Sequence, residues 1–140
     1  IIRGDAEARS PHEAYYYYAG EELQAIRSGA WKLHFAHDFL TSDSPPGRAG
    51  GPANYENMKP MAMSVSGLAG IASRHGYIVR HQPQALFNLK DDIGETRDVA
   101  AEHPDVVARL TKLAESARAD LGDTLTGRKG ANVRAAGKLP

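Results

Sequence analysis

One stretch in the last third of the chain has the spacing of an amphipathic helix. Its apolar residues recur at intervals of four, three, four and four positions, which places them on one helical face. Pro104 suits a first helical position, Asp105 follows in the positively polarised first turn, and Gly122 suits a helix end. The spacing predicts a helix from about Pro104 to Leu121 whose apolar face needs a second layer. The members of this face are Val106, Leu110, Leu113, Ala117 and Leu121.

Strand-like segments supply that second layer. Tyr15 to Tyr18 have high strand propensity, and Ser28-Gly29 favours a tight hairpin. In the segment after this hairpin, Trp31, Leu33 and Phe35 alternate with polar or small residues, so they point to one face. We therefore predict an α+β fold, a small four-stranded antiparallel sheet packed against a long C-terminal helix. The strands are expected at Ala14–Ala19, Leu23–Arg27, Trp31–Ala36 and Ala85–Leu89.

The 140 residues are enough for one domain with a hydrophobic core. A long loop or insertion is expected at residues 41–76, because Ser44-Pro45-Pro46-Gly47 and similar stretches exclude regular structure there. Met58–Ile71 fits no pattern, whereas Tyr77–Arg80 has the character of a short strand. Residues 123–140 are rich in glycine and basic side chains, so an extended tail is expected.

Composition excludes several classes of protein. The 17 basic and 17 acidic residues cancel, whereas a nucleic-acid-binding domain would carry a basic surplus. No apolar run approaches the roughly 20 residues that span a bilayer. The absence of cysteine rules out disulfides, thiolate zinc sites and cysteine nucleophiles. The chain begins at Ile1 rather than at methionine, so we expect the natural protein to start earlier, and its location is unknown.

The polar residues form no complete catalytic or metal-binding pattern. His34 and His37 are separated by an odd number of positions, so in a strand they would point to opposite faces. Asp91, Asp92 and Glu95 form an acidic turn that lacks the regularly spaced oxygen ligands of a calcium loop. No nucleophile-elbow or phosphate-loop spacing is present. We therefore expect no catalytic residue and no metal site in this chain.

Two motif blocks resemble the C-terminal subdomain of the formylglycine-dependent sulfatases, the arylsulfatase family. The first is the tyrosine-rich segment followed by the hairpin Arg27-Ser28-Gly29-Ala30-Trp31-Lys32. The second is Leu86-Phe87-Asn88-Leu89, then Asp92-Ile93-Gly94-Glu95 and His103-Pro104. Ile93 stands where the family commonly has proline, and Asn88 where aspartate is common. The order and spacing of the blocks match the family pattern over most of the chain.

The resemblance implies that the whole protein hydrolyses sulfate esters, with a formylglycine and a calcium ion as cofactors. In the family both belong to a larger N-terminal domain, so we assign neither to this chain. The chain would be inactive alone and would brace the catalytic domain of the same polypeptide. In family members the loop after the third strand approaches the substrate pocket. On that resemblance His37 and Asp38 are expected to line the leaving-group side, the alternative being that His37 is only a surface loop residue.

A second interpretation remains open, in which the chain is a free-standing binding or interaction module with the same sheet-and-helix fold. For a bacterial parent, a periplasmic or secreted location fits the resemblance. Separated from a catalytic domain, the chain would expose apolar surface and would either self-associate or leave part of the 41–76 loop mobile.

Overall fold

The structure is a computed structural model, and it describes residues 10–41 and 78–134. The chain divides into two compact units, one formed by residues 1–35 and 84–140 and the other by residues 36–83. No helix within the described ranges is long and apolar enough to cross a membrane.

The first unit contains a four-stranded antiparallel sheet with the strand order β1-β2-β3-β6. Gly29, with a φ of +61°, makes the tight turn between β2 and β3, as the sequence predicted. Gln24 is an extra residue in β2 and produces a bulge opposite Tyr17 and Tyr18. The strands are β1 (Tyr15–Ala19), β2 (Glu22–Ser28), β3 (Trp31–His34) and β6 (Ala85–Asn88).

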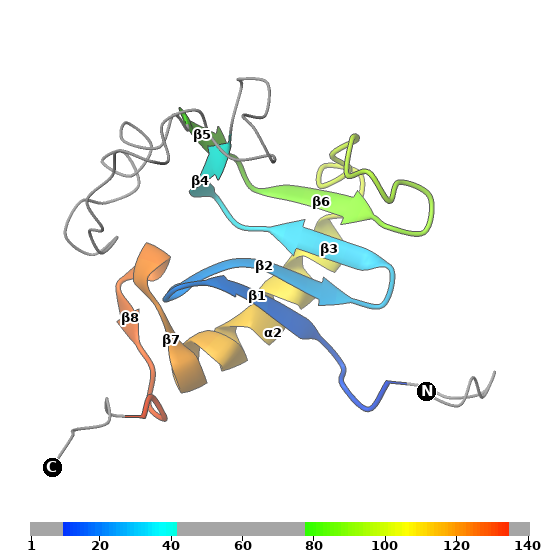
Figure 1. Cartoon of the computed structure of the whole chain (residues 1–140). Helices are drawn as coiled ribbons and strands as arrows, with labels where there is room; N and C mark the ends of the chain where they lie inside the picture. Colours follow the sequence, from blue (N-terminus) through cyan, green and yellow to red (C-terminus); the bar gives the residue numbers. More distant parts are fainter. Residues whose placement is uncertain (1–9, 42–77, 135–140) are drawn as a thin grey trace, which may run out of the picture. The chain divides into compact units, whose positions relative to one another are not determined.

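Helix α2 (Pro104–Leu121) has the bounds that the sequence predicted, and it covers one face of the sheet (Figure 1). Leu33 of β3 and Leu110 of α2 are fully buried between the two layers. The α+β fold is therefore confirmed, with the core between sheet and helix. The buried cluster consists of Leu23, Ile26, Leu33, Phe35, Leu86, Leu110, Ala114 and Ala117.

The helix differs from the prediction at its last turn. Leu121 was placed on the apolar face, but its side chain is half-exposed. The backbone turns away at Gly122, where φ is +86°, and Leu121 stays outside the buried cluster between sheet and helix. Arg118 takes the buried position in this turn instead. An arginine can be buried here because its aliphatic part packs against apolar side chains and its charge is paired. The pattern of apolar residues did not predict this buried position.

Residues 122–130 are ordered rather than a plain extended tail. They form β7 (Gly122–Asp123), a single 3-10 turn η3 (Thr124–Thr126) and β8 (Arg128–Lys129), which pairs with β7. The following main chain then returns to the helix end, where the amides of Ala131 and Asn132 donate to the carbonyls of Ala119 and Asp120. These bonds satisfy carbonyl groups that the last helical turn leaves without partners.

The second unit contains a two-stranded antiparallel ribbon of β4 (His37–Thr41) and β5 (Ile78–Gln82). The prediction that the third strand continues to Ala36 is wrong, because the chain bends at Ala36 after β3 ends at His34. The strand expected at Tyr77–Arg80 is present as β5. Most of the predicted 41–76 loop, with Met58–Ile71, lies outside the described residues.

Candidate functional site

The sheet face opposite α2 carries a cluster of three polar side chains, Lys32, His34 and Glu95. Lys32 and His34 alternate with the buried Leu33, so both point away from the helix. Between them lies the carboxylate of Glu95, from the turn that follows β6. Lys32 Nζ is 2.6 Å from Glu95 Oε1, and His34 Nε2 is 2.7 Å from Oε2. One carboxylate therefore ties the turn to the middle of the sheet.

The turn itself is held in an unusual backbone conformation. Glu95 has a φ of +54°, the left-handed region that side chains other than glycine rarely adopt. The neighbouring Asp92 carboxylate accepts hydrogen bonds from the amides of Arg97 and Thr96 and from the Thr96 hydroxyl. The Arg97 amide, followed by the contacts of Thr96, lowers the pKa of Asp92. Strain of this kind persists where surrounding contacts enforce it.

Charge pairing also governs the ionisation of Glu95. Its partial burial acts to raise the pKa, but the hydrogen bonds from Lys32 and His34 outweigh burial, and the pKa is lowered from its ordinary value. Glu95 is therefore a carboxylate at neutral pH. Aromatic rings flank the cluster, since Lys32 Nζ lies 5.2 Å from the ring centroid of Tyr17 and Phe87 meets His34 edge-on.

The two residues predicted to line a substrate pocket lie in strand β4, not in a loop. His37 is its first residue and is buried, with its ring 6.3 Å from that of Phe39. Asp38 is exposed, and its Oδ1 is 2.8 Å from Nδ1 of His81 on β5, directly opposite. His37 is therefore neither exposed nor in a loop, which leaves open the alternative that it has no role in the substrate pocket. Whether these residues contact a substrate stays a prediction.

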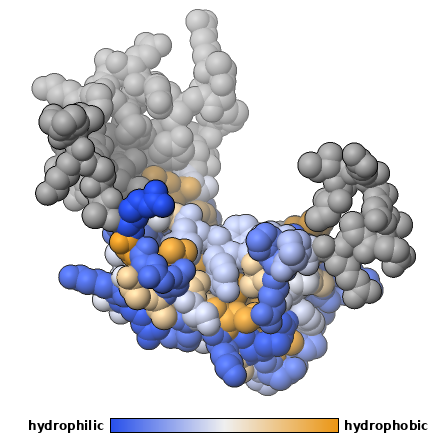
Figure 2. Space-filling model, turned by 90° about the horizontal axis from the view of Figure 1, so that it is seen from below, coloured by the Kyte–Doolittle hydropathy of each residue, from blue (hydrophilic) through white to orange (hydrophobic). Residues whose placement is uncertain are grey.

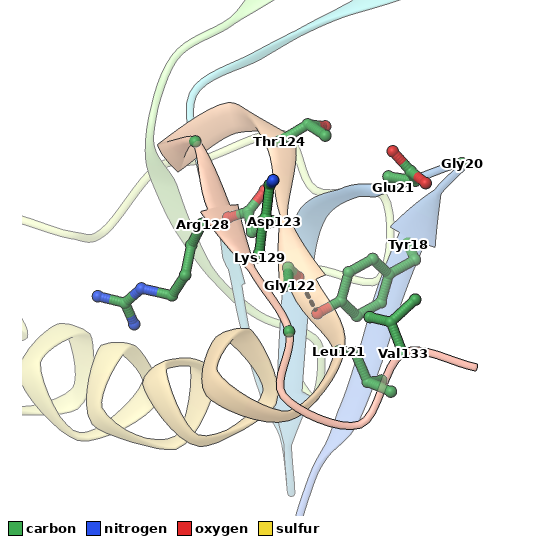
Figure 3. A pocket seen from close by; sticks show the side chains of 12 residues that line it. Tyr18, Gly20, Glu21, Leu121, Gly122, Asp123, Thr124, Arg128, Lys129 and Val133 are labelled. Carbon is green, nitrogen blue, oxygen red and sulfur yellow. Dashed lines mark hydrogen bonds between the residues drawn. The ribbon is translucent and has the colours of Figure 1, made fainter. Parts of the chain in front are cut away.

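A pocket of about 760 Å³ lies at the C-terminal end of α2, beside the β1–β2 turn (Figure 3). Leu121 and Val133 lie beside the ring of Tyr18, whose hydroxyl donates to the carbonyl of Gly122 at 2.9 Å. Burial, followed by the nearby Asp123 carboxylate, raises the pKa of Tyr18. Glu21 and Lys129 add one acidic and one basic side chain to the lining. No sequence motif marks this pocket, because the chain reversal after Gly122 creates it.

Beneath the pocket, Arg118 and Asp123 form a buried ion pair. Arg118 also binds Glu115, and its guanidinium lies 4.3 Å from the ring centroid of Phe35. Burial acts to lower the pKa of Arg118, but the hydrogen bonds to Glu115 and Asp123 outweigh it and raise that pKa. The sequence analysis missed this pair. One feature of the sequence could have predicted the pair: Arg118 lies on the apolar face of the helix, five residues before Asp123 at the helix end.

Comparison with known proteins identifies the family. The family model described as the C-terminal region of aryl-sulfatase matches residues 10–134. The chain is 31% identical over 129 residues to the steryl-sulfatase of Mus musculus, a match that covers 86% of this chain and 18% of the relative.

It is also 28% identical over 123 residues to the arylsulfatase of Hemicentrotus pulcherrimus, covering 86% of this chain and 20% of the relative. The chain thus spans about a fifth of the length of these curated relatives. Its order of elements agrees with the motif blocks that the sequence analysis matched to the sulfatases. The chain belongs to the family formed by the C-terminal regions of the aryl-sulfatases.

Proposed function

We propose that this chain is the C-terminal part of an arylsulfatase-type sulfuric ester hydrolase, and that it braces the catalytic domain of the same polypeptide. The match of the aryl-sulfatase C-terminal model over residues 10–134 carries this proposal. Both named relatives are sulfatases, and about four fifths of each lies outside the matched part. The whole protein would cleave a sulfate ester of a phenol or a sugar.

The residues that the structure describes do not fit the calcium ion that the family implies, and the chain lacks the cysteine from which formylglycine can be made. The chain has no cysteine, and the described residues contain no group of three or more acidic, histidine or cysteine side chains placed to hold a metal ion. In the proposal, the formylglycine and the calcium ion therefore belong to the catalytic domain. No catalytic step is assigned to this chain.

One short stretch bears on this assignment. Ser44, Pro46 and Arg48 stand at the spacing of the Ser-x-Pro-x-Arg pattern from which formylglycine is made, a match that the sequence analysis did not register. The stretch lies outside the described residues and is rich in proline and glycine. A pattern of three fixed residues is weak without its structural context. We therefore propose that Ser44 is not a formylglycine precursor.

In this function, the Lys32–Glu95–His34 cluster fixes the turn after β6, and the β4–β5 ribbon supplies His37 and Asp38 to one wall of the substrate pocket. The buried position of His37 and the pairing of Asp38 with His81 give both side chains defined orientations, as pocket residues require.

The test compares the isolated chain with the whole protein on a chromogenic aryl sulfate, with and without calcium. We expect the whole protein to turn over the substrate and the isolated chain to give only the buffer rate. The matched control is Ser44→Ala in both forms, which should leave the rate of the whole protein unchanged. Turnover by the isolated chain that Ser44→Ala abolishes would place the chemistry in this chain and overturn the proposal.

The alternative of a free-standing interaction module makes a different prediction. It requires no upstream catalytic sequence in the same reading frame. An upstream α/β coding sequence with a Cys/Ser-x-Pro-x-Arg motif would exclude the alternative, and its absence would favour it.

A further inference from the structure

The face of the molecule that is seen from below is more polar than apolar. Hydrophobic residues form only small patches there among hydrophilic ones (Figure 2). Surfaces that bind an apolar partner expose larger contiguous patches. A further role of the described residues is therefore best sought among polar side chains, and one pair in the second unit, Asp38 and His81, has a defined geometry.

Asp38 and His81 face each other across the two strands of the β4–β5 ribbon. They are partners in its antiparallel register, so their side chains leave the ribbon on the same face. Asp38 Oδ1 is 2.8 Å from Nδ1 of His81. Because a carboxylate can only accept, Nδ1 carries the proton and donates this hydrogen bond. The contact therefore fixes the orientation of both the carboxylate and the imidazole ring.

This hydrogen bond is poorly placed to stabilise the fold. The side chains of His81 and Asp38 are 62% and 54% exposed, and exposed ion pairs contribute little to stability. Its effect is instead to hold one rotamer, since an exposed aspartate otherwise turns about its two side-chain bonds. Oδ1 is occupied by His81, whereas Oδ2 accepts no hydrogen bond from the described residues. Oδ2 is thus the atom that Asp38 presents to another group.

We propose that His81 is a positioning residue for Asp38 in the substrate pocket, where it holds Oδ1 so that Oδ2 is presented to the leaving-group side of the sulfate ester. This inference rests on the proposed function, which places Asp38 in the wall of that pocket. Residues that bind a substrate need their rotamers fixed by neighbouring side chains, and His81 is such a neighbour. His81 acts through Asp38 and itself contacts no substrate atom.

The test measures kcat/KM for an aryl sulfate in the whole protein and its variants. His81→Leu removes the donor to Asp38. His81→Asn keeps a donor, because the amide nitrogen of asparagine takes the place of Nδ1, but it has no counterpart of Nε2. We expect His81→Leu to lower kcat/KM about fivefold, and His81→Asn to stay within about twofold of the wild type.

A double-mutant cycle shows whether His81 acts through Asp38. In the Asp38→Ala background, His81→Leu should lower kcat/KM further by no more than about twofold, because the residue that it positions is gone. The matched control is His12→Leu, the same replacement at an exposed histidine of the first unit, and it should leave kcat/KM unchanged. All variants should keep the melting temperature of the wild type, which separates positioning from a structural role.

The possible failures are distinguishable. Full activity of His81→Leu beside an impaired Asp38→Ala would overturn the inference and leave the proposed function in place. Equal losses for His81→Asn and His81→Leu would mean that Nε2 contacts the substrate, which also overturns it. An inactive whole protein, or an Asp38→Ala variant of full activity, would overturn the proposed pocket and the role of His81 with it.

Discussion

Arg118 Nε lies 2.8 Å from Asp123 Oδ2, and the two side chains are only 7% and 0% exposed. The other oxygen of Asp123 accepts hydrogen bonds from the amides of Leu23 and Leu125. One buried carboxylate therefore joins the last turn of α2, the start of β2 and the 3-10 turn. Buried charges require partners, and here each partner lies on a different element.

We expect Asp123→Asn to lower the free energy of unfolding by about 3–5 kcal/mol, because it removes the buried charge that pairs with Arg118 and leaves only the partly exposed Glu115 as a charged partner. Urea denaturation measures this loss. The control is Asp120→Asn, which changes an exposed aspartate three residues earlier and should cost no more than about 0.5 kcal/mol. Equal losses of stability for the two substitutions would show that the buried Arg118–Asp123 pair makes no specific contribution to the free energy of unfolding.

The core between sheet and helix gives a second prediction. Leu110 is fully buried against the sheet, so Leu110→Ala should cost about 2–5 kcal/mol, through lost burial and the cavity that remains. Lys112→Ala, on the exposed side of the same helix, is the control and should change stability by about 0.5 kcal/mol at most. An unchanged melting temperature for Leu110→Ala would contradict the packing described here.

The periodic features of the sequence predicted the fold well, and the non-periodic features did not. The apolar spacing of α2 and the alternation of Trp31, Leu33 and Phe35 are set by neighbouring positions in the sequence. Both patterns could therefore be recognised without knowledge of tertiary contacts. Arg118 is buried because it forms an ion pair with Asp123, which lies beyond the end of the helix. The spacing of residues within the helix does not predict that ion pair. The same holds for Glu95, whose partners Lys32 and His34 lie more than sixty positions earlier.

Candidate site residues were harder to predict than the core. The sequence indicated His37 and Asp38 only through a family resemblance, and the bend at Ala36 that places them in a separate strand has no proline or glycine to mark it. The ordered segment after Gly122 escaped prediction because its hydrogen bonds go to distant partners, such as Thr124 donating to the carbonyl of Glu21.

Glu95 gives a prediction for pH. Its pKa in the folded chain lies below the ordinary 4.5, so the carboxylate contributes stability above about pH 4.5 and loses that contribution as pH falls through the folded value. Glu95→Gln should therefore be less stable than the wild-type chain at pH 7, by about 1–2 kcal/mol. The difference should shrink towards pH 3, and thermal unfolding at several pH values measures it.

The control for this prediction is Glu102→Gln, which removes an exposed ion pair with Arg97. Exposed pairs contribute little, so this variant should follow the wild-type chain within about 0.5 kcal/mol at every pH. A stability difference for Glu95→Gln that stays constant from pH 7 to pH 3 would show that lost packing, and not lost charge, causes it.

The last prediction concerns His37 and Asp38 in the whole protein. If the β4–β5 ribbon forms a wall of the substrate pocket, then His37→Ala and Asp38→Asn should each lower kcat/KM for an aryl sulfate about tenfold, equivalent to about 1.4 kcal/mol of lost transition-state stabilisation. Measurements with two leaving groups of different size would locate the effect, because residues on the leaving-group side should discriminate between them. Glu102→Gln serves again as the control. If both variants kept full activity on both substrates, His37 and Asp38 would not line the pocket. The role of this chain in the whole protein would then be purely structural.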